Sequence, residues 1–572
     1  MSQHAAAGAV HAVSARPFPW ERSYPPGIRW DTPIPASTIP RLLDNAVRDY
    51  AEFPAIDFRG RTTTYADLGR ETHRVAAAFV CAGVRPGTPV ALYLPNTPYH
   101  PLAFFGGAAA GARLAHLSPL DAERELAHKL ADSGARILVT TNIGGMYERA
   151  VKLVEAGLLD RLIVGDDAAW GASPAPPSPI VEGGIVQTFA SFVADADPEA
   201  VLPEVRPEDV ALLQYTGGTT GMPKGAILTH GNLTSAVAMY EAWFTGLPGD
   251  RTERDRIICV LPLFHIYALT TILLRGLKRG AEILIRTRFD VETTLRDVEV
   301  GRATHFPGVP TMWIALSAAP DIDKRDFSSL AYCGSGGAPL PVEVADRFQK
   351  LTGHALVGGW GMTETSPAGT NRLGLGPSKP GTIGLPLPGI EMDVASLDDP
   401  HRVLAPGEVG EIRIRGPNVT QGYWNRPVES AASFADGWFL TGDIGYMDED
   451  GFFFIVDRKK DMIISGGFNV YPQMIEQAIY EHPAVEECLV IGVSDAYRGE
   501  AAKAFVKLRA GAAPFSIEQL QAFLKDKLGR HEMPQLLEIR AALPRTAVGK
   551  LSKVELRDEE RANAAAAQRG AA

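Results

Sequence analysis

The amino-acid sequence predicts an α/β protein with two unequal parts: a large N-terminal domain of doubly wound sheets and a small α+β C-terminal domain. The first observation is a rhythm of short strands and helices between about residues 39 and 330. The second is a change of character after about residue 458, where a compact α+β pattern begins. The third is the length, because 572 residues exceed the about 100–200 residues that one ordinary core organises.

Strand and helix patterns alternate most clearly between residues 90 and 140 of the large domain. The expected strands are 90–94, 113–117 and 136–140, and the expected helices are 98–111 and 122–133. Such alternation favours a parallel sheet with helices packed on its faces. A stretch rich in proline, alanine and glycine, residues 171–184, predicts a surface loop.

The small domain is expected to combine two strands with two helices. The strands are 488–493 and 504–508, and the helices are 474–480 and 517–528. We expect the large domain to span residues 31–459 and the small domain 460–556. The first 30 residues are expected to form an N-terminal tail, and the alanine-rich residues 557–572 a disordered C-terminal tail.

Composition and charge narrow the class of partner. The chain has 56 basic and 67 acidic residues, a formal net charge of −11, and no long basic run, which disfavours nucleic acid. The four cysteines, Cys81, Cys259, Cys333 and Cys488, are far apart and lack C-x-x-C spacing. They disfavour a zinc ribbon or a disulfide framework and fit a reducing cytoplasm. The sequence contains no run of about 18 apolar residues, so we expect no transmembrane helix. A peripheral membrane contact stays open.

The strongest local signal is the string YTGGTTGMPKG at residues 215–225. Its glycines free the backbone to bring N–H groups close to an anion, while threonine hydroxyls and a lysine add donors and charge. The residues expected to contact a polyphosphate are Thr216, Gly217, Gly218, Thr219, Thr220, Gly221 and Lys224. The spacing differs from the Walker A pattern, and an ordinary Gly/Thr turn is the plain alternative.

This string resembles the phosphate-binding signature of the adenylate-forming superfamily: acyl-CoA synthetases, luciferases and the adenylation domains of peptide synthetases. Further signatures follow in order, namely WGMTET at 360–365, TGD at 441–443, DRKKD at 457–461, ISGGFNVYP at 464–472 and PRTAVGK at 544–550. The resemblance covers about residues 38–554. It implies a distorted β-barrel in the large domain, a mobile small domain, and use of ATP, Mg²⁺ and coenzyme A.

The resemblance assigns the nucleotide contacts residue by residue. Trp360 is expected to stack on adenine, because a purine presents a π-face to any aromatic ring. Glu364 suits Mg²⁺, a hard ion that prefers carboxylate oxygens, and Asp443 can accept the ribose hydroxyls. Arg458 is implied near the ribose and phosphate, and Lys460 at the hinge between the domains. Further implied contacts are Gly337, Ala338, Pro339, Gly361, Met362 and Thr363.

Lys550 is implied as the adenylation lysine. A carboxylate oxygen attacks the α-phosphorus of ATP, so two anions meet and negative charge grows on the phosphate oxygens, which a lysine stabilises. The small domain is then implied to rotate about Lys460, which withdraws Lys550. Gly466 and Gly467 would line the tunnel for the pantetheine arm, where a small residue permits close backbone approach.

Three segments resemble the walls of the acyl pocket: 261–268, 307–313 and 333–339. They are mostly apolar, which favours an alkyl chain over an amino acid. His265 is expected near the substrate carboxylate. In peptide-synthetase domains an Asp at this point holds the substrate amine, and here the pair is Phe264–His265.

Residues 24–30 resemble bacterial fatty-acid and dicarboxylate-CoA ligases. A dicarboxylate would need a cation at the far end of the pocket, and the candidates are Arg275, Lys278 and Arg286.

These patterns predict a cytoplasmic, ATP-dependent acyl-CoA ligase, a monomer or homodimer, that acts on medium- or long-chain fatty acids. The products would be acyl-CoA, AMP and pyrophosphate, formed through an acyl-adenylate. A dicarboxylate- or aryl-CoA ligase and an oxygenating luciferase stay open, whereas a peptide-synthetase module would continue into a carrier domain. The alternative of another class is a catalytically dead nucleotide-binding protein, against which the intact Lys224, Glu364, Asp443 and Lys550 argue.

Overall fold

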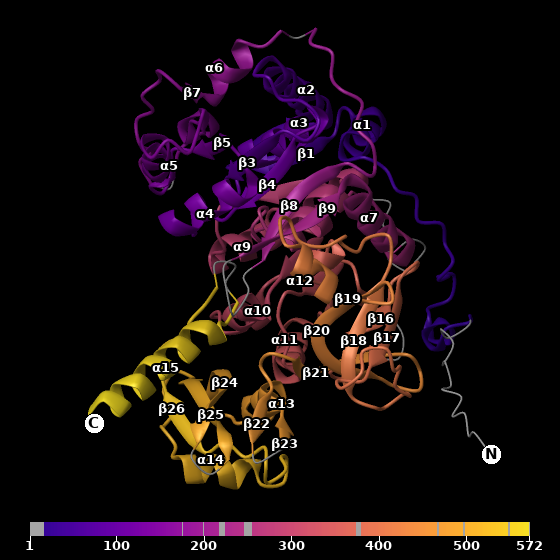
Figure 1. The fold of residues 1–572 in the computed structure, drawn as a ribbon, viewed down its shortest axis with the longest axis vertical. Coiled ribbons are helices and arrows are strands. Elements are labelled where there is room, and N and C mark those ends of the chain that lie inside the picture. Colours follow the sequence, from indigo (N-terminus) through magenta and orange to yellow (C-terminus); the bar gives the residue numbers. More distant parts are fainter. Residues whose placement is uncertain are drawn as a thin grey trace, which may run out of the picture.

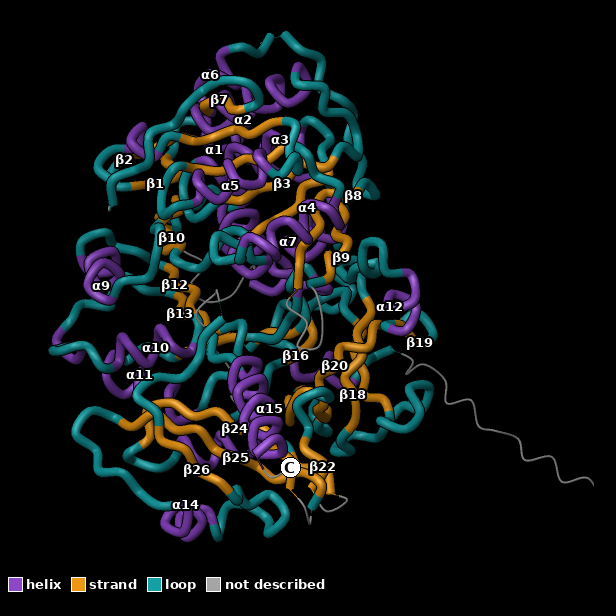
Figure 2. The backbone as a smooth tube through the Cα atoms, turned by 60° about the vertical axis from the view of Figure 1, so that its left-hand side comes forward, coloured by secondary structure: helices purple, strands orange, loops and turns teal. Residues whose placement is uncertain are grey.

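The computed structural model describes residues 16–173, 175–197, 199–216, 223–244, 254–372, 379–465, 468–495, 498–546 and 550–570. The large domain forms most of the molecule, and the small domain lies at the end opposite α6 (Phe189–Ala194) in both views (Figures 1 and 2). Among the described residues, no helix has the length and apolar character needed to cross a membrane.

The first large sheet has seven strands in the order β7-β6-β5-β3-β4-β8-β9. The bounds are β3 (Pro89–Tyr93), β4 (Arg113–Leu117), β5 (Ile137–Thr141), β6 (Arg161–Gly165), β7 (Val186–Thr188), β8 (Val210–Thr216) and β9 (Lys224–Thr229). All neighbouring pairs are parallel except β8 and β9. The expected strands and the helices between them, α3 (Tyr99–Ala109) and α4 (Glu123–Ser133), are therefore confirmed to within two residues.

The second large sheet also has seven strands, in the order β14-β13-β12-β10-β11-β1-β2. The bounds are β1 (Pro54–Phe58), β2 (Arg61–Thr64), β10 (Arg256–Cys259), β11 (Glu282–Ile285), β12 (His305–Gly308), β13 (Tyr332–Ser335) and β14 (Leu356–Gly358). Only β2 runs antiparallel to its neighbour within this sheet. Parallel strands align their carboxyl ends, so β10, β12 and β13 end at one edge, where a ligand can bind.

Helices cover both sheets; one hydrophobic core joins the two sheets, and a second core lies between the first sheet and the helices α4 and α5 (Met146–Glu155). Helix α3 is buried on all sides, and Gly106 allows this because a Cβ there would lie 2.5 Å from Cγ1 of Val75. Thr38 caps α1 (Ile39–Tyr50) and Thr64 caps α2 (Tyr65–Cys81) by accepting backbone N–H groups. The other helices are α6, α7 (His230–Phe244), α8 (Arg275–Lys278), α9 (Val291–Glu299), α10 (Pro310–Ser317) and α11 (Val342–Thr352).

An antiparallel five-stranded sheet stands where the distorted barrel is expected. Its strands are β17 (Glu391–Ala395), β18 (Gly410–Arg415), β19 (Phe434–Ala435), β20 (Trp438–Met447) and β21 (Phe453–Arg458), with α12 (Pro427–Ala432) before β19. The short pair β15 (Thr370–Asn371) and β16 (Leu385–Pro386) joins it through a bridge between Gly384 and Phe453. This sheet places residues 441–443 beside residues 457 and 458.

The N-terminal tail is shorter than expected. Residues 16–30 pack on the core of the antiparallel sheet, and Phe18, Trp20 and Ile28 are buried there. These residues pack on the core because their side chains are apolar, and burying one large aromatic ring stabilises the fold by about 2–3 kcal/mol. The first 15 residues lie outside the described part of the chain.

The small domain contains a five-stranded sheet, more than the two strands expected. The strands are β22 (Ile463–Ser465), β23 (Phe468–Val470), β24 (Val485–Asp495), β25 (Gly499–Leu508) and β26 (Leu536–Ile539), and the helices are α13 (Pro472–Tyr480), α14 (Ile517–Leu524) and α15 (Lys553–Gly570). The two expected strands lie within β24 and β25, and the two expected helices correspond to α13 and α14.

The C-terminal segment corrects the expectation of a disordered tail from residue 557. It continues α15 instead, as Figure 1 shows in yellow. Leu556 is buried, Arg557 pairs with Asp461 at 2.9 Å, and Glu560 accepts a hydrogen bond from Lys503 at 2.8 Å. Alanine, arginine and glutamate are strong helix formers, so the same composition supports a helix once these contacts anchor its first turns.

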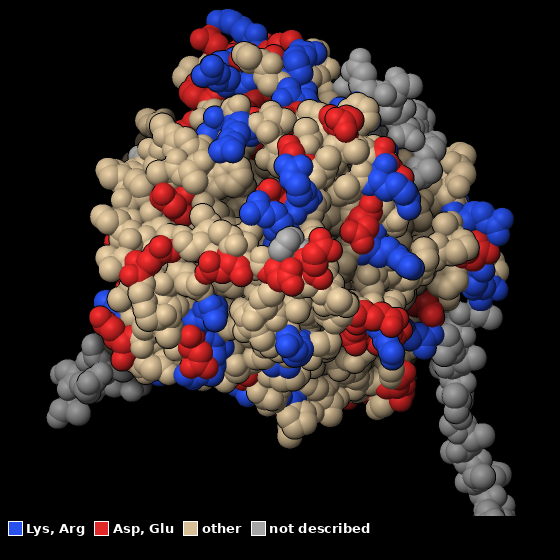
Figure 3. All heavy atoms as spheres, turned by 90° about the horizontal axis from the view of Figure 1, so that it is seen from above, with Lys and Arg blue, Asp and Glu red and all other residues tan. Residues whose placement is uncertain are grey.

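Basic and acidic side chains are mixed on the face seen from above in Figure 3. Lysine and arginine side chains alternate there with aspartate and glutamate.

Candidate active site

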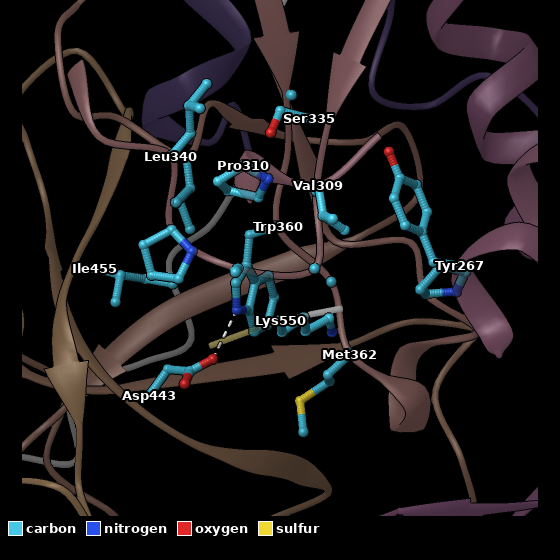
Figure 4. Close-up of a pocket in the computed structure, with 18 of the residues that line it drawn as sticks. Tyr267, Val309, Pro310, Ser335, Leu340, Trp360, Met362, Asp443, Ile455 and Lys550 are labelled. Atoms are coloured by element: carbon cyan, nitrogen blue, oxygen red, sulfur yellow. Dashed lines mark hydrogen bonds between the residues drawn. The ribbon is translucent and has the colours of Figure 1, made fainter. Parts of the chain in front are cut away.

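A cavity of about 1600 Å³ lies between the two domains. The carboxyl ends of β12 and β13 form one wall, the antiparallel sheet a second, and residues 550–552 with the start of α15 a third. Most of the residues proposed from sequence as site residues line this cavity (Figure 4). They are Thr216, Lys224, His265, Gly337, Ala338, Pro339, Trp360, Gly361, Met362, Thr363, Glu364, Asp443, Arg458, Lys460 and Lys550.

Two groups of site residues cannot be placed. Gly217, Gly218, Thr219, Thr220 and Gly221 lie outside the described residues, as do Gly466 and Gly467. The neighbours of the first group are described, and Thr216 pairs with Lys224 across β8 and β9. Thr216 and Lys224, which flank the first group in the sequence, both line the cavity.

A buried carboxylate, Asp443, joins two of the predicted nucleotide residues. It sits opposite Arg458 in the pairing of β20 with β21, and the Arg458 Nε lies 2.5 Å from its Oδ1. The Trp360 indole N–H donates to its other oxygen, Oδ2, at 2.6 Å (Figure 4). Burial raises the pKa of Asp443, while the Arg458 charge opposes that rise. Sequence reasoning did not foresee that Trp360 holds this carboxylate.

The chain on both sides of Glu364 folds so tightly that Gly361 and Gly369 have no room for a side chain. A Cβ on Gly361 would overlap the backbone carbonyl oxygen of Pro367, and one on Gly369 would lie 2.5 Å from the Trp360 ring. Close backbone approach of this kind fixes Trp360 and Glu364 relative to each other.

Glu364 is buried and accepts a hydrogen bond from the Tyr423 hydroxyl at 2.8 Å. Burial raises the pKa of Glu364. The same tyrosine brings Lys224 close, with its Nζ 5.4 Å from the ring centroid. Tyr423 is a residue that sequence reasoning missed, because a tyrosine beside Gly422 carries no chemical signal until the backbone bridge to Ala226 places it here.

Lys550 crosses from the small domain into the large one. Gly337 has φ +76°, and a Cβ there would lie 2.7 Å from the lysine Cε and 3.0 Å from its Nζ. Burial, followed by repulsion from Arg458, lowers the pKa of Lys550 to about 8. The lysine therefore carries its charge at neutral pH and loses it in mildly alkaline solution.

His265 lies near this lysine and is held neutral. Burial, followed by the Lys550 charge, lowers the pKa of His265 to about 3. Its Nδ1 accepts the backbone N–H of Tyr267 at 3.2 Å, which assigns the ring proton to Nε2. A neutral imidazole can donate this proton in a hydrogen bond to a substrate oxygen.

A buried polar chain supports the same wall and was also missed. The Gln214 amide donates to the backbone oxygen of Phe264 at 2.9 Å, and its Oε1 lies 3.1 Å from Nδ1 of His116. Burial lowers the pKa of His116 to about 4, so this imidazole is neutral as well. Glutamine and histidine on separate strands gave no pattern along the sequence.

Of the three cations considered for a dicarboxylate, one reaches the cavity. Arg275 lines it and is buried, with its Nε 3.0 Å from Oε1 of Glu241. Arg286 instead pairs with Asp57 and Asp297, and Lys278 is exposed. Neither Arg286 nor Lys278 is among the cavity-lining residues.

Comparison with known proteins defines the class first. An anthranilate CoA ligase structure with bound anthranoyl-AMP superposes with a TM-score of 0.82 at 25% identity and covers 94% of this chain and 99% of that one. A benzoate CoA ligase from Burkholderia xenovorans gives 0.79 at 27% identity, covering 91% and 100%. The fold is that of the adenylate-forming ligases, as predicted.

The family follows from the sequence matches. The AMP-binding enzyme profile matches residues 43–424 and the profile of the AMP-binding enzyme C-terminal domain matches 474–550. A Bacillus subtilis long-chain-fatty-acid–CoA ligase is 38% identical over 95% of this chain and 98% of its own length. A feruloyl-CoA synthase from an Amycolatopsis species is 38% identical over 88% and 95%. The chain belongs to the AMP-binding enzyme family.

Proposed function

We propose that this chain is an AMP-forming fatty acyl-CoA ligase. The observation that carries the proposal is Lys550 of the small domain, which lies against Gly337 of the large domain and next to the neutral His265. The similarity to long-chain-fatty-acid–CoA ligases across nearly the whole chain supports the same activity.

In the first half-reaction, the acid carboxylate attacks the α-phosphorus of ATP and pyrophosphate leaves. Lys550 would bind the carboxylate and the phosphate oxygens, whose negative charge grows in the transition state. His265 would donate from Nε2 to the other carboxylate oxygen. A neutral donor fits this place, because a second positive charge so close to Lys550 would lower the charged fraction of both groups.

The nucleotide would lie along the Asp443–Arg458 pair. Asp443 would accept hydrogen bonds from the ribose hydroxyls on the lone pairs that Trp360 and Arg458 leave unused. Lys224 and the segment 217–221 would hold the polyphosphate.

Glu364 fits a magnesium ion. Mg²⁺ usually keeps several waters and takes one or two carboxylates together with phosphate oxygens, so a single buried carboxylate is a suitable donor set. Among the described residues no three His, Cys, Asp or Glu side chains converge as a metal cage. When bound, the ion would neutralise phosphate charge, while Tyr423 would orient the carboxylate.

In the second half-reaction, the CoA thiol attacks the acyl-adenylate and AMP leaves. We propose that the small domain rotates about Lys460, withdraws Lys550 and brings Gly466 and Gly467 to the pantetheine path. Gly467→Leu should then block thioester formation and leave pyrophosphate exchange largely intact. A parallel loss of both reactions would remove the tunnel role.

Near Lys550 the proposed acyl pocket has apolar walls, which include Val309, Pro310 and Leu340 (Figure 4). Ile314 also lines the cavity. Each buried CH₂ contributes about 0.8 kcal/mol, so kcat/KM should rise about fourfold per methylene until the pocket fills. A panel of straight-chain acids, with AMP formation as the readout, tests the proposal. Absence of AMP with every acid would support a nucleotide-binding protein without catalysis.

An aryl acid is the second candidate, favoured by the feruloyl-CoA synthase relative. Aryl acids belong in the same panel.

We further propose a cytoplasmic monomer or homodimer, in keeping with four cysteines that are all free thiols.

A further inference from the structure

The cavity changes character with distance from Lys550. Beyond the apolar walls it is lined by Tyr240, Arg275, His305 and Tyr332, together with Phe244 and Ile257. His305 begins β12 and Tyr332 begins β13, so this region lies toward the amino ends of the strands, while Lys550 lies at their carboxyl ends. None of these polar residues belongs to the three segments that were expected to form the pocket walls, 261–268, 307–313 and 333–339.

Strand β13 and the residues after it indicate how far apart the polar groups of the pocket lie. A Cβ on Gly334 would lie 3.2 Å from the Tyr332 hydroxyl, and one on Gly336 would lie 3.1 Å from the Tyr267 hydroxyl. The corresponding position on Gly337 is 3.0 Å from the Lys550 amine. The three polar groups thus follow the backbone from 334 to 337. Strand β13 ends at Ser335 and Gly337 has φ +76°, so this path covers at most the about 10 Å that three extended residues span.

The tyrosine hydroxyls of this region can bind a ligand. Among the described residues, those of Tyr240 and Tyr267 make no recorded hydrogen bond, although both rings line the cavity. Tyr332 packs on Phe244 with ring centroids 5.6 Å apart and has the Asn371 side chain beside its hydroxyl. Figure 4 shows the Tyr267 hydroxyl directed away from Lys550. Burial raises the pKa of all three phenols, so they remain protonated donors.

The charge of Arg275 is already balanced. Its Nε bonds to Glu241, and its guanidinium carbon lies 4.5 Å from the centroid of the Phe244 ring. Glu241 also pairs with Arg279 at 3.4 Å, and Arg279 lies 4.0 Å from Asp255. Among the residues that the structure describes, Arg275 and Arg279 are thus paired with Glu241 and Asp255, so Arg275 is not an uncompensated cation that could offset a buried carboxylate. The region suits a neutral oxygen.

We propose that Tyr332, with Tyr240 and Arg275, recognises a neutral oxygen-bearing group (a hydroxyl, a ketone or a phenol) that the acid carries about 10 Å from its carboxylate. This inference rests on the proposed ligase activity and narrows its substrate class. An unsubstituted long chain spans about 15 Å, half the hydrocarbon core of a bilayer, and would run past these donors without satisfying them. Buried donors left unpaired disfavour that acid.

The test compares acids that differ by one hydroxyl. With C–C bonds of about 1.5 Å, an extended chain of about eight carbons covers the distance. The pairs are 8-hydroxyoctanoate with octanoate, and 4-hydroxycinnamate with cinnamate, each followed by AMP formation. The wild-type enzyme should prefer the hydroxylated acid of at least one pair by about tenfold in kcat/KM, equivalent to about 1.4 kcal/mol.

Two variants locate the preference, and a third serves as control. Tyr332→Phe and Tyr240→Phe each remove a hydroxyl and keep the ring, and at least one should bring the ratio to within about twofold of unity. Tyr99→Phe is the matched control, because its hydroxyl bonds to the Asp166 backbone oxygen at 2.8 Å and does not line the cavity. This control should keep the wild-type ratio.

The outcomes separate this inference from the proposed function. Activation of octanoate as well as or better than 8-hydroxyoctanoate, with no preference in the aryl pair, overturns the inference and leaves the ligase intact. A preference that survives in both tyrosine variants also overturns it. If no acid, hexadecanoate included, yields AMP, the proposed function itself fails.

Discussion

The adenylation half-reaction should carry an alkaline limb that belongs to Lys550. The lysine is charged below its pKa of about 8 and neutral above it, so the rate falls as pH rises. At pH 9 about one enzyme molecule in eleven keeps the charge, and kcat/KM should fall about tenfold from its plateau. His265 contributes no acid limb near neutrality, since its pKa is about 3.

The assay is ATP–pyrophosphate exchange between pH 6 and 9.5, with thioester formation from supplied acyl-adenylate measured in parallel. Lys550→Arg is the matched control, because a guanidinium stays charged throughout and should flatten the limb at some cost in rate. Lys550→Ala should reduce adenylation by about 10²–10³-fold or more, the usual effect of removing a group that stabilises transition-state charge. Thioester formation should be nearly unchanged in both variants.

Two results would refute this reasoning. One is a wild-type profile that stays flat to pH 9.5, which would mean that Lys550 is not buried in the state that binds substrate. The other is an equal loss of both half-reactions in Lys550→Ala, which would contradict withdrawal of the lysine before thioester formation.

Three further predictions concern packing, domain position and charge. Gly361→Ala should destabilise the fold by about 3 kcal/mol in urea unfolding, since its Cβ meets backbone, while Gly225→Ala, with ordinary contacts, should not. Arg509→Ser breaks a 2.8 Å pair with Glu343 that joins the domains, and should slow pyrophosphate exchange up to about fivefold without slowing thioester formation; equal slowing would contradict it. Glu241→Gln should raise the diacid-to-monoacid ratio of kcat/KM about tenfold by leaving Arg275 uncompensated, and an unchanged ratio would place diacids away from Arg275.

The sequence determined the family, the chemistry and most regular elements of this protein. Motifs such as 215–225 and 544–550 can be recognised in the sequence, because phosphate binding and adenylation need particular residue types at short spacing. Strand β4 matches its expected bounds because period and length both point to a strand. The C-terminal tail could not be predicted, since the same residues suit a disordered tail or a helix until Leu556 and Arg557 find partners.

Only the tertiary structure decided how the site is assembled. Trp360 and Asp443 are 83 residues apart, and their bond exists because the antiparallel sheet meets the carboxyl edge of the second large sheet. Tyr240 lies within helix α7, Arg275 begins α8 and Tyr332 begins β13, so no local pattern reveals that they share one pocket. Local propensity and motif spacing depend on a few neighbouring residues. The polarity of a pocket depends on side chains from several helices and strands, which only the order of the strands in the sheets brings together.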